Sequence, residues 1–416
     1  MSRMPIRTFL VAAKRQLQDS IRDQTYTSFV IGNESADLDS ITCALVYGYI
    51  QSSKIESKRT GRLVVPIANL PASDLPLRTE LTALLKHAGI KPSDLITLDD
   101  LGTSPLPLDK TDWTLVDHNA LQGQLGERYR SRVVGVIDHH EDDNAVPKDA
   151  ALRIIEKCGS CNSLMINSQR ETWQSLGSMV STSAVGLGQD DILIDDFAYA
   201  STWDGQVAKL SLGSILIDTG NMEIESKVTD HDRKAVRYLE AKINVSPKLG
   251  KDYDRKKFFN EIHDAKMEIS SLSLADVFRK DYKEWKEGDL TLGMSSVVQS
   301  YSYLQATGED LQAALKSFAQ KKSLDLYSIT TSGTDESGQF YKEILLTALG
   351  GQKATKAVER FVAIAKDDLQ LGDRDGVKWS APSDPDISFQ HLWNQGNVEA
   401  SRKQVAPFLR KAMADQ

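Results

Sequence analysis

An apolar, β-branched segment at residues 133–137 ends abruptly in the polar triplet Asp138-His139-His140, and this feature most constrains the fold. Such a segment is typical of a strand buried on both faces in a parallel sheet. Open α/β sheets bind their ligands just beyond the carboxyl ends of such strands. We therefore expect His139 and His140 to lie at a ligand-binding edge of a parallel sheet.

The same arrangement recurs at three other apolar segments. Residues 113–116 run into Asp117, residues 29–32 run into a loop with Asp37 and Asp39, and residues 207–217 run into Asp218. The last segment fits a helix or a strand by periodicity. Random placement would not put an acid or imidazole at the end of four successive apolar elements, so we expect these side chains to converge.

Strands and helices alternate through roughly the first 240 residues, which predicts βαβ units and a mostly parallel sheet. The expected strands are 29–32, 63–68, 95–98, 113–116, 133–137 and 153–156, and the expected helices are 8–20, 41–49 (capped by Asp39 or Ser40), 75–88, 160–173, 190–200 and 229–243 (capped by Thr229). Residues 244–250 look like a linker, so we predict domains at 1–245 and 246–416. In the second, the expected helices are 256–269, 274–285, 309–321 (capped by Thr307) and 355–367, and the expected strands are 290–298, 324–330 and 343–349.

Composition excludes several classes of protein. A chain of 416 residues suits two α/β domains better than a single core. No apolar run approaches the roughly 18 residues of a membrane span. The net charge of −8 argues against a general nucleic-acid-binding surface.

Three cysteines, an odd number, argue against a disulfide framework and for a reducing compartment. Residues 158–161 have CxxC spacing, which we interpret as structural because a single pair is a weak zinc signal. The basic N-terminus admits a mitochondrial presequence, but apolar positions in residues 8–20 favour an ordinary amphipathic helix.

The two halves of the chain differ in chemistry. Carboxylates and imidazoles at one edge of the first domain are ligands for divalent cations, and a pair of such ions can hold a phosphoryl group and activate water. The second half instead carries basic clusters, which could neutralise a polyanionic substrate at a site between the domains. Each feature taken alone has a simpler explanation, since Asp residues often cap helices and turns and basic clusters are often solvated surfaces.

At this point the sequence resembles the DHH phosphoesterases. Four segments are similar to the motifs of that family, residues 33–40, 116–119, 137–140 and 217–219, and residues 400–407 are similar to the closing motif of the DHHA2 domain. This pairing is typical of the branch with family II inorganic pyrophosphatases, prune proteins and fungal-type cytosolic exopolyphosphatases. It implies an N-terminal parallel-sheet DHH domain with flanking helices, a smaller α/β DHHA2 domain, and an active site in the cleft between them.

The resemblance also implies roles for individual residues. Asp37 and Asp117 would bind one of two divalent ions, Mg²⁺ or Mn²⁺, and Asp39, Asp117, His139 and Asp218 would bind the other, with Asp117 bridging. His140 would contact phosphate, Lys283, Arg402 and Lys403 would bind substrate, and Asp138 would support a histidine or loop.

One position departs from the pyrophosphatase pattern, because Asn33 replaces a histidine ligand. An amide suits Mn²⁺ or Co²⁺ less well than imidazole does, and oxygen-rich sites suit Mg²⁺. We place Asn33 with the substrate-binding residues and expect Mg²⁺ to support activity at least as well as Mn²⁺.

These implications predict an exopolyphosphatase that releases orthophosphate from the end of linear polyphosphate, with a metal-bridging hydroxide as the nucleophile. We expect a cytoplasmic monomer that binds polyphosphate and phosphate but neither nucleic acid nor membrane, with a mitochondrial fraction left open. Two alternatives also stay open: a prune-like or pyrophosphatase-like hydrolase of short phosphoanhydrides or nucleotide phosphodiesters, and a catalytically weak phosphate-binding interaction protein.

Overall fold

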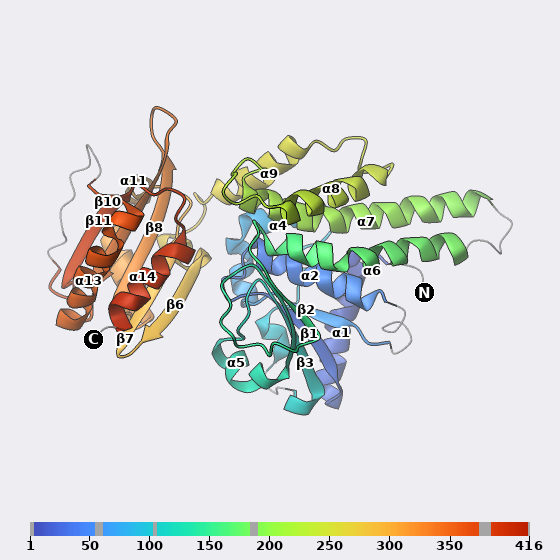
Figure 1. Ribbon diagram of the computed structural model, residues 1–416, viewed down its shortest axis with the longest axis horizontal. Coiled ribbons are helices and arrows are strands. Elements are labelled where there is room, and N and C mark those ends of the chain that lie inside the picture. The colour runs from blue at the N-terminus through green and yellow to red at the C-terminus, as the bar shows by residue number, and fades with distance from the viewer. Residues whose placement is uncertain (1–3, 55–60, 103–105, 184–189, 374–383, 415–416) are drawn as a thin grey trace. The chain divides into compact units, whose positions relative to one another are not determined.

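The computed structural model describes residues 4–54, 61–102, 106–183, 190–373 and 384–414, and it describes side chains outside residues 177–198. Within this range the chain forms two compact units, residues 1–266 and 267–416 (Figure 1). This division falls at the last residue of helix α9 (Arg255–Met267), whereas the boundary expected from the sequence falls before that helix. None of the helices described is long and apolar enough to cross a membrane.

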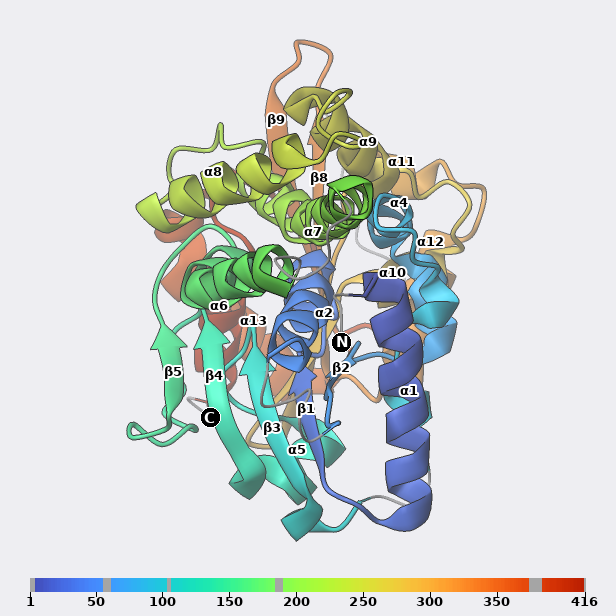
Figure 2. The same cartoon turned by 90° about the vertical axis from the view of Figure 1, so that its right-hand side faces the viewer.

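The first unit is built on a sheet of five parallel strands in the order β2-β1-β3-β4-β5. In Figure 2 the arrowheads point the same way, toward helices α2 and α6. The strands are β1 (Thr27–Ile31), β2 (Val64–Ile67), β3 (Thr111–Val116), β4 (Val133–Asp138) and β5 (Leu152–Ile155). The parallel sheet predicted from the sequence is confirmed.

Helices α2 and α6 pack on this sheet, and α7 and α8 pack on them in turn. The α-helices are α1 (Ile6–Asp23), α2 (Leu38–Ser52), α4 (Thr79–Lys86), α5 (Gly123–Tyr129), α6 (Cys161–Ser183), α7 (Asp190–Thr219), α8 (Asp230–Val245) and α9. Short 3-10 turns are η1 (Ala72–Leu77), η2 (Pro92–Asp94), η3 (Leu98–Leu101), η4 (Leu108–Lys110) and η5 (Arg130–Arg132). The core is continuous from sheet to helices, and Phe29 and Trp113 stack within it with their ring centroids 4.4 Å apart.

Two predictions about the first unit hold and one is refined. Helix α1 buries Phe9, Leu10 and Leu17, as the amphipathic pattern predicts. Thr229 caps α8 in a capping box with Asp232. Residues 190–200 and 207–217, expected as a helix and as a helix or strand, form the single helix α7. Its 30 residues contain no proline, and the glycines inside it do not end the helix.

Three other predictions about this unit are wrong. Residues 95–98 form no strand, because Thr97 makes only a single bridge to Ala68 between two 3-10 turns. The start of the helix expected at 75–88 is the 3-10 turn η1, which contains Pro76. The cap of α2 is Asp37, whose carboxylate accepts from the Ser40 amide, so Asp39 lies in the first turn and not in a loop.

The second unit is a mixed sheet in the order β10-β11-β9-β8-β7-β6, in which only β7 and β8 are parallel neighbours. The strands are β6 (Tyr282–Glu287), β7 (Leu290–Ser296), β8 (Leu326–Thr334), β9 (Phe340–Ala348), β10 (Leu371–Gly372) and β11 (Phe389–Gln395). The helices are α10 (Leu274–Lys280), α11 (Tyr301–Gln305), α12 (Leu311–Lys321), α13 (Gly351–Leu369) and α14 (Arg402–Ala414).

Both faces of this second sheet are buried, since successive strand residues point to opposite sides. Leu326 and Ile344 pack in the cluster with α13 and α14, and Tyr327 and Leu345 pack in the cluster with α10 and α12. The two-domain α/β architecture predicted from the sequence is therefore confirmed.

The helix expected over residues 274–285 is wrong in its second half. Helix α10 ends at Lys280, and residues 282–287 pair with β7 as strand β6, with alternating burial along the strand. Asp310, and not Thr307, caps α12. Strand β11 and helix α14 were not predicted; residues 400–407 were used only as a motif of the DHHA2 domain, and Pro407 lies inside α14.

Candidate metal centre

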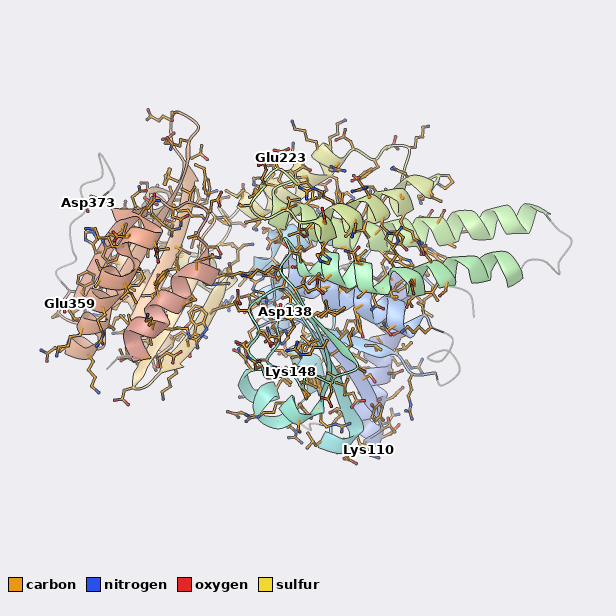
Figure 3. The ribbon with its side chains drawn as sticks, viewed as in Figure 1. Lys110, Asp138, Lys148, Glu223, Glu359 and Asp373 are labelled. Atoms are coloured by element: carbon orange, nitrogen blue, oxygen red, sulfur yellow. The ribbon has the colours of Figure 1, made fainter. Side chains whose placement is uncertain are left out.

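The carboxyl ends of β1, β3 and β4 are neighbours at one edge of the first sheet, and each carries a predicted site residue. Asp117 directly follows β3, and Asp138 ends β4 ahead of His139 and His140. Figure 3 labels Asp138 near the middle of this unit and Lys110, which precedes β3, at the far end of the sheet. The sheet therefore gathers these side chains at the edge where parallel sheets bind ligands.

The loop after β1 is drawn tightly against α2. A Cβ atom on Gly32 would lie 2.6 Å from the Ser40 Cβ, so only glycine allows this approach. The loop also contains Ala36, whose φ of 45° lies in the left-handed region. This close packing sets Asp37 at the start of α2 and turns Asn33 toward β3.

Asp117 adopts a left-handed backbone conformation, with φ of 61°, which is rare for a residue with a side chain. Its Oδ2 atom accepts from the Ser40 hydroxyl at 2.6 Å and from the Asn33 amide at 2.8 Å. With Oδ2 engaged in this way, Oδ1 faces His139 Nε2 at 3.2 Å. One oxygen of Asp117 is thus anchored and the other is presented to the site.

His139 is held in one tautomer. Its Nδ1 lies 3.0 Å from the Cys158 carbonyl oxygen, which can only accept, so we assign the hydrogen of the neutral ring to Nδ1. The lone pair of Nε2 then faces Asp117 Oδ1 at 3.2 Å and Asp39 Oδ2 at 3.9 Å. An imidazole nitrogen close to two carboxylate oxygens is a set of atoms that a cation can bind.

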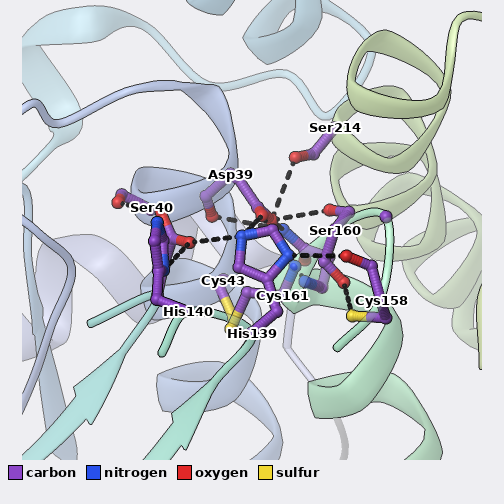
Figure 4. Close-up of polar contacts among 12 residues, drawn as sticks. Asp39, Ser40, Cys43, His139, His140, Cys158, Ser160, Cys161 and Ser214 are labelled. Atoms are coloured by element: carbon purple, nitrogen blue, oxygen red, sulfur yellow. Dashed lines mark hydrogen bonds and ion pairs between the residues drawn. The ribbon is translucent and has the colours of Figure 1, made fainter. Parts of the chain in front are cut away.

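Asp39 accepts hydrogen bonds from residues at the N-terminus of α6 and from Ser214 of α7 (Figure 4). Its Oδ1 accepts from the Ser160 hydroxyl at 2.8 Å, from the Asn162 amide groups at 2.7 and 3.0 Å, and from the Ser214 hydroxyl at 3.2 Å. Its Oδ2 accepts from the Cys161 backbone N–H at 2.7 Å and is the oxygen that faces His139. Sequence reasoning did not find these donors, because serine and asparagine at a helix start read only as caps.

Asp218 lies near the end of α7, close enough to Asp39 and Asp37 for their charges to act on it. Burial raises its pKa well above the usual value, and the charges of Asp39 and Asp37 raise it further. Its Oδ2 atom is buried without a hydrogen-bond partner. A buried acceptor among other carboxylates has the chemistry expected of a cation ligand.

His140 has a different environment from His139. Its Nδ1 lies 2.7 Å from Asp138 Oδ1, which also accepts from the backbone amides of both histidines. Burial acts to raise the pKa of Asp138, but the hydrogen bond and charge of His140 and a hydrogen bond from Asn119 outweigh it, so the pKa is lowered. Asp138 therefore supports a histidine, as predicted, and leaves Nε2 as the nitrogen of His140 not engaged by Asp138.

The donor set fits divalent metal ions. Within the part of the chain described, Asp117, His139 and His140 offer ligand atoms that all lie within 4.8 Å of one another, and Asp39 Oδ2 is close to His139. Carboxylate oxygens with imidazole nitrogen suit Mg²⁺ and Mn²⁺. This cluster contains Asp117 and His139 of the predicted ligands, and it also contains His140, whose Nδ1 contacts Asp138. The assignment of Asp37, Asp39, Asp117, His139 and Asp218 as the ligand set stays a prediction.

The position of Asn33 departs from the prediction of a substrate contact. Its Nδ2 donates to both the carbonyl oxygen and the Oδ2 of Asp117, and its Oδ1 accepts from the Ser35 amide. The side chain is buried, with an exposed fraction of 6%. The Nδ2 end of the amide therefore holds Asp117, and the Oδ1 end fixes the side chain to its own loop.

The predicted substrate-binding residues of the second unit share one end of its sheet. Lys283 is the second residue of β6, and Arg402 begins α14 and pairs with Asp281, its NH2 lying 2.7 Å from Asp281 Oδ1 and its NH1 2.8 Å from the Asp281 carbonyl. Lys403 is exposed in the first turn of α14. The structure thus brings Arg402 beside the start of the strand that carries Lys283.

The CxxC segment forms no disulfide, since all three cysteines are free. Cys161 is buried, its thiol donates to the Ile137 carbonyl, and its Sγ lies 3.8 Å from that of Cys43. Burial raises the pKa of the half-buried Cys158 thiol to about 11. Thiols held in this way are inert, which agrees with the structural interpretation of the motif.

Comparison with known proteins gives the family. The model of the DHH family, N-terminal domain, matches residues 27–185, and that of the DHHA2 domain matches residues 260–412. A Schizosaccharomyces pombe protein named "Putative exopolyphosphatase" is 33% identical over 382 residues, which are 92% of this chain and 90% of that protein. The chain belongs to the DHH family, with a C-terminal DHHA2 domain.

Other similarities to this DHH-family chain are more distant. Human "Exopolyphosphatase PRUNE1" is 26% identical over 390 residues, 92% of this chain and 75% of that protein. A Methanococcus jannaschii crystal structure, described as a putative family II inorganic pyrophosphatase, superposes with a TM-score of 0.55 at 18% identity and covers 93% of this chain and 99% of its own. That likeness supports the two-domain DHH fold.

Proposed function

We propose that this chain is an exopolyphosphatase that hydrolyses the terminal phosphoanhydride bond of linear inorganic polyphosphate and releases orthophosphate. The observation that carries the proposal is the set of inward-facing acceptors on Asp117, His139 and Asp39, with the buried Oδ2 of Asp218 in the same site. The similarity to proteins named exopolyphosphatase supports the choice of substrate.

The metal centre supplies Lewis acidity: a pair of divalent ions lowers the pKa of water and neutralises charge on a phosphoryl group. The residues that would hold it are Asp37, Asp39, Asp117, His139 and Asp218. Ser40 and Asn33 fix Asp117 so that Oδ1 points inward, and the Cys158 carbonyl fixes the tautomer of His139. Asp117 and His139 are therefore already oriented before a metal ion binds, which limits the reorganisation that binding requires.

His140 is proposed to bind the terminal phosphoryl group of polyphosphate, which is the group released. Asp138 Oδ1 accepts the Nδ1 hydrogen and orients the ring, so Nε2 is the nitrogen for a phosphoryl oxygen. Although burial acts to raise it, the pKa of Asp138 is lowered, so this carboxylate is ionised at neutral pH and accepts from Nδ1. Lys283, Arg402 and Lys403 are proposed to bind the remaining phosphates, in a DHHA2 domain that the sequence places at residues 246–416.

The test is an assay of phosphate release against substrate length. Purified protein with Mg²⁺ should release orthophosphate from long polyphosphate much faster than from pyrophosphate, and it should not cleave a cyclic nucleotide. Preference for pyrophosphate or the cyclic nucleotide would support the short-substrate alternative. Binding of polyphosphate without turnover would support the interaction-protein alternative.

Chain length and salt should both change affinity. A long polyanion contacts more cationic side chains than a short one, and salt screens those contacts, with a Debye length of about 10 Å at 0.1 M. We expect KM to fall as the polyphosphate chain lengthens and to rise with KCl, more steeply for long chains than for triphosphate. Length-independent KM values would contradict an extended binding surface.

Lys283 can be tested against a neighbour on the same strand. Replacing Lys283 with alanine should raise KM for polyphosphate by about 10-fold or more, because a hydrogen bond to a charged group contributes about 1.5–3 kcal/mol. Lys286→Ala is the matched control, since residues 283 and 286 point to opposite faces of β6 and Lys286 is exposed. Equal effects of the two substitutions would show that Lys283 contributes only surface charge.

A further inference from the structure

The turn between β5 and α6 contacts two of the proposed metal ligands through different atoms. The Cys158 carbonyl accepts from His139 Nδ1, at 3.0 Å. The backbone N–H of Cys161 and the hydroxyl of Ser160 donate to the two oxygens of Asp39, at 2.7 and 2.8 Å. The orientation of His139 and the position of Asp39 therefore depend on the conformation of one short turn, residues 158–162.

A second buried carboxylate, that of Asp232, accepts hydrogen bonds from the backbone of this turn. Asp232, in the first turn of α8, has an exposed fraction of 0%. Its Oδ2 accepts from the Gly159 amide at 3.0 Å, and its Oδ1 accepts from the Ser163 hydroxyl at 2.6 Å and the Ser160 amide at 3.3 Å. Among the contacts described, Asp232 makes none with a proposed ligand, so any effect it has on the metal centre acts through the turn.

The turn also packs tightly against the end of α7. A Cβ on Gly159 would lie 2.6 Å from Thr219 Cγ2, 2.9 Å from the Lys227 carbonyl oxygen and 3.1 Å from Asp232 Oδ1. Thr219 directly follows the proposed ligand Asp218. Only glycine at this position therefore lets the turn contact both Asp232 and the end of α7, the helix that carries Asp218.

We propose that Asp232 is a positioning residue that sets the metal affinity of the centre by fixing the turn of residues 158–162. A carboxylate suits this place because it only accepts, and every group around it that is named here donates. An asparagine would present its NH₂ group to an amide or hydroxyl donor and would push the turn away from one of them. The inference rests on the ligand set of the proposed function but not on the identity of the substrate.

A simpler reading is that Asp232 serves only α8. Its Oδ2 also accepts from the amide and hydroxyl of Thr229, in the capping box of that helix. Loss of the cap alone would lower the melting temperature of the protein, as the loss of other helix caps does, and would leave its metal affinity unchanged. Metal affinity therefore distinguishes the two roles.

The test is a Mn²⁺ titration of the full-length Asp232→Asn protein followed by electron paramagnetic resonance, with no substrate present. Partners that orient metal ligands typically change metal affinity by about 10–100-fold, and we expect Mn²⁺ to bind more weakly by that factor. Phosphate release should fall at limiting Mn²⁺ and recover at excess Mn²⁺, because the ligands themselves remain.

Asp204→Asn is the matched control. Asp204 is also a buried carboxylate of the helical layer, where it accepts from Trp173 Nε1 and pairs with Lys242 at 2.8 Å. It precedes Asp218 by fourteen residues of α7, about 21 Å along a helix. This variant should lose stability but keep the Mn²⁺ affinity of the unmodified protein.

The outcomes separate this inference from the proposed function. If Asp232→Asn lowers the melting temperature but binds Mn²⁺ as Asp204→Asn does, Asp232 only caps α8 and the inference is overturned. If Asp232→Asn does not fold, Ser163→Ala removes the hydroxyl that donates to Asp232 at 2.6 Å, with little change in volume, and should weaken Mn²⁺ binding several-fold; unchanged binding overturns the inference. If Asp117→Asn also binds Mn²⁺ normally, the ligand set itself is wrong.

Discussion

Replacing Asp117 with asparagine should leave a folded protein that has lost at least about 10³-fold in kcat, because the proposed function makes Asp117 a ligand of both ions, and loss of such a ligand should cost more than loss of a residue that orients one. The amide oxygen can take the place of Oδ2 and accept from Ser40 and Asn33 as before. The amide nitrogen then faces His139 Nε2, across a separation of 3.2 Å in the native structure, and donates to it. This hydrogen bond would occupy His139 Nε2 and replace Asp117 Oδ1, so a cation would lose both atoms as ligands.

The measurement is kcat for phosphate release, together with the melting temperature and a Mn²⁺ titration. Asp112→Asn is the control on the same strand, because Asp112 pairs with Arg132 at the other end of β3, about 17 Å from Asp117. That variant should keep its activity. Retained activity in Asp117→Asn would show that Asp117 does not bridge metal ions.

Removing divalent ions with a chelator should abolish phosphate release, and Mg²⁺ should restore it at least as well as Mn²⁺. The physical reason is that Asp117 Oδ1, His139 Nε2 and Asp39 Oδ2 face one another, and Asn33 provides no imidazole to favour the softer ion. Activity restored only by Mn²⁺ or Co²⁺ would contradict this preference.

The same experiment should change stability. A ligand that binds only the native state at about 100 times its dissociation constant stabilises that state by about 2.7 kcal/mol. Mg²⁺ should therefore raise the melting temperature of the chelated protein, since it relieves the repulsion that raises the pKa of Asp218 beside Asp39 and Asp37. Asp117→Asn serves as the control and should show little or no rise.

Much of the first unit could be predicted because the relevant physics is local. The run at 133–137 is apolar and β-branched, and such a run has few alternatives to a buried strand. Asp138 and the two histidines follow it, so their place at the sheet edge followed from strand direction alone. The helix capped by Thr229 was predicted correctly for the same reason, since a capping box is encoded within four residues.

Predictions failed where a strand is recognisable only from the strand that pairs with it. Residues 282–287 carry no turn signal that separates them from α10, and they form β6 only because β7 is available to pair with them. Strand β11 likewise depends on β9, more than forty residues earlier in the chain. A period of two in a short polar segment is a weak signal until its partner is known.

The sequence by itself determined the fold class and the family and predicted the residues of the candidate metal centre, because strand direction places their side chains at one edge and the motifs are contiguous. Only the tertiary structure decided how those ligands are held: which oxygen of Asp117 faces inward, which nitrogen of His139 carries its hydrogen, and that Asp232 supports the turn beneath them. These are contacts between groups up to about 120 residues apart. Their geometry is set by the packing of α2 and α6 on the sheet and of α8 on α6, which no local pattern encodes.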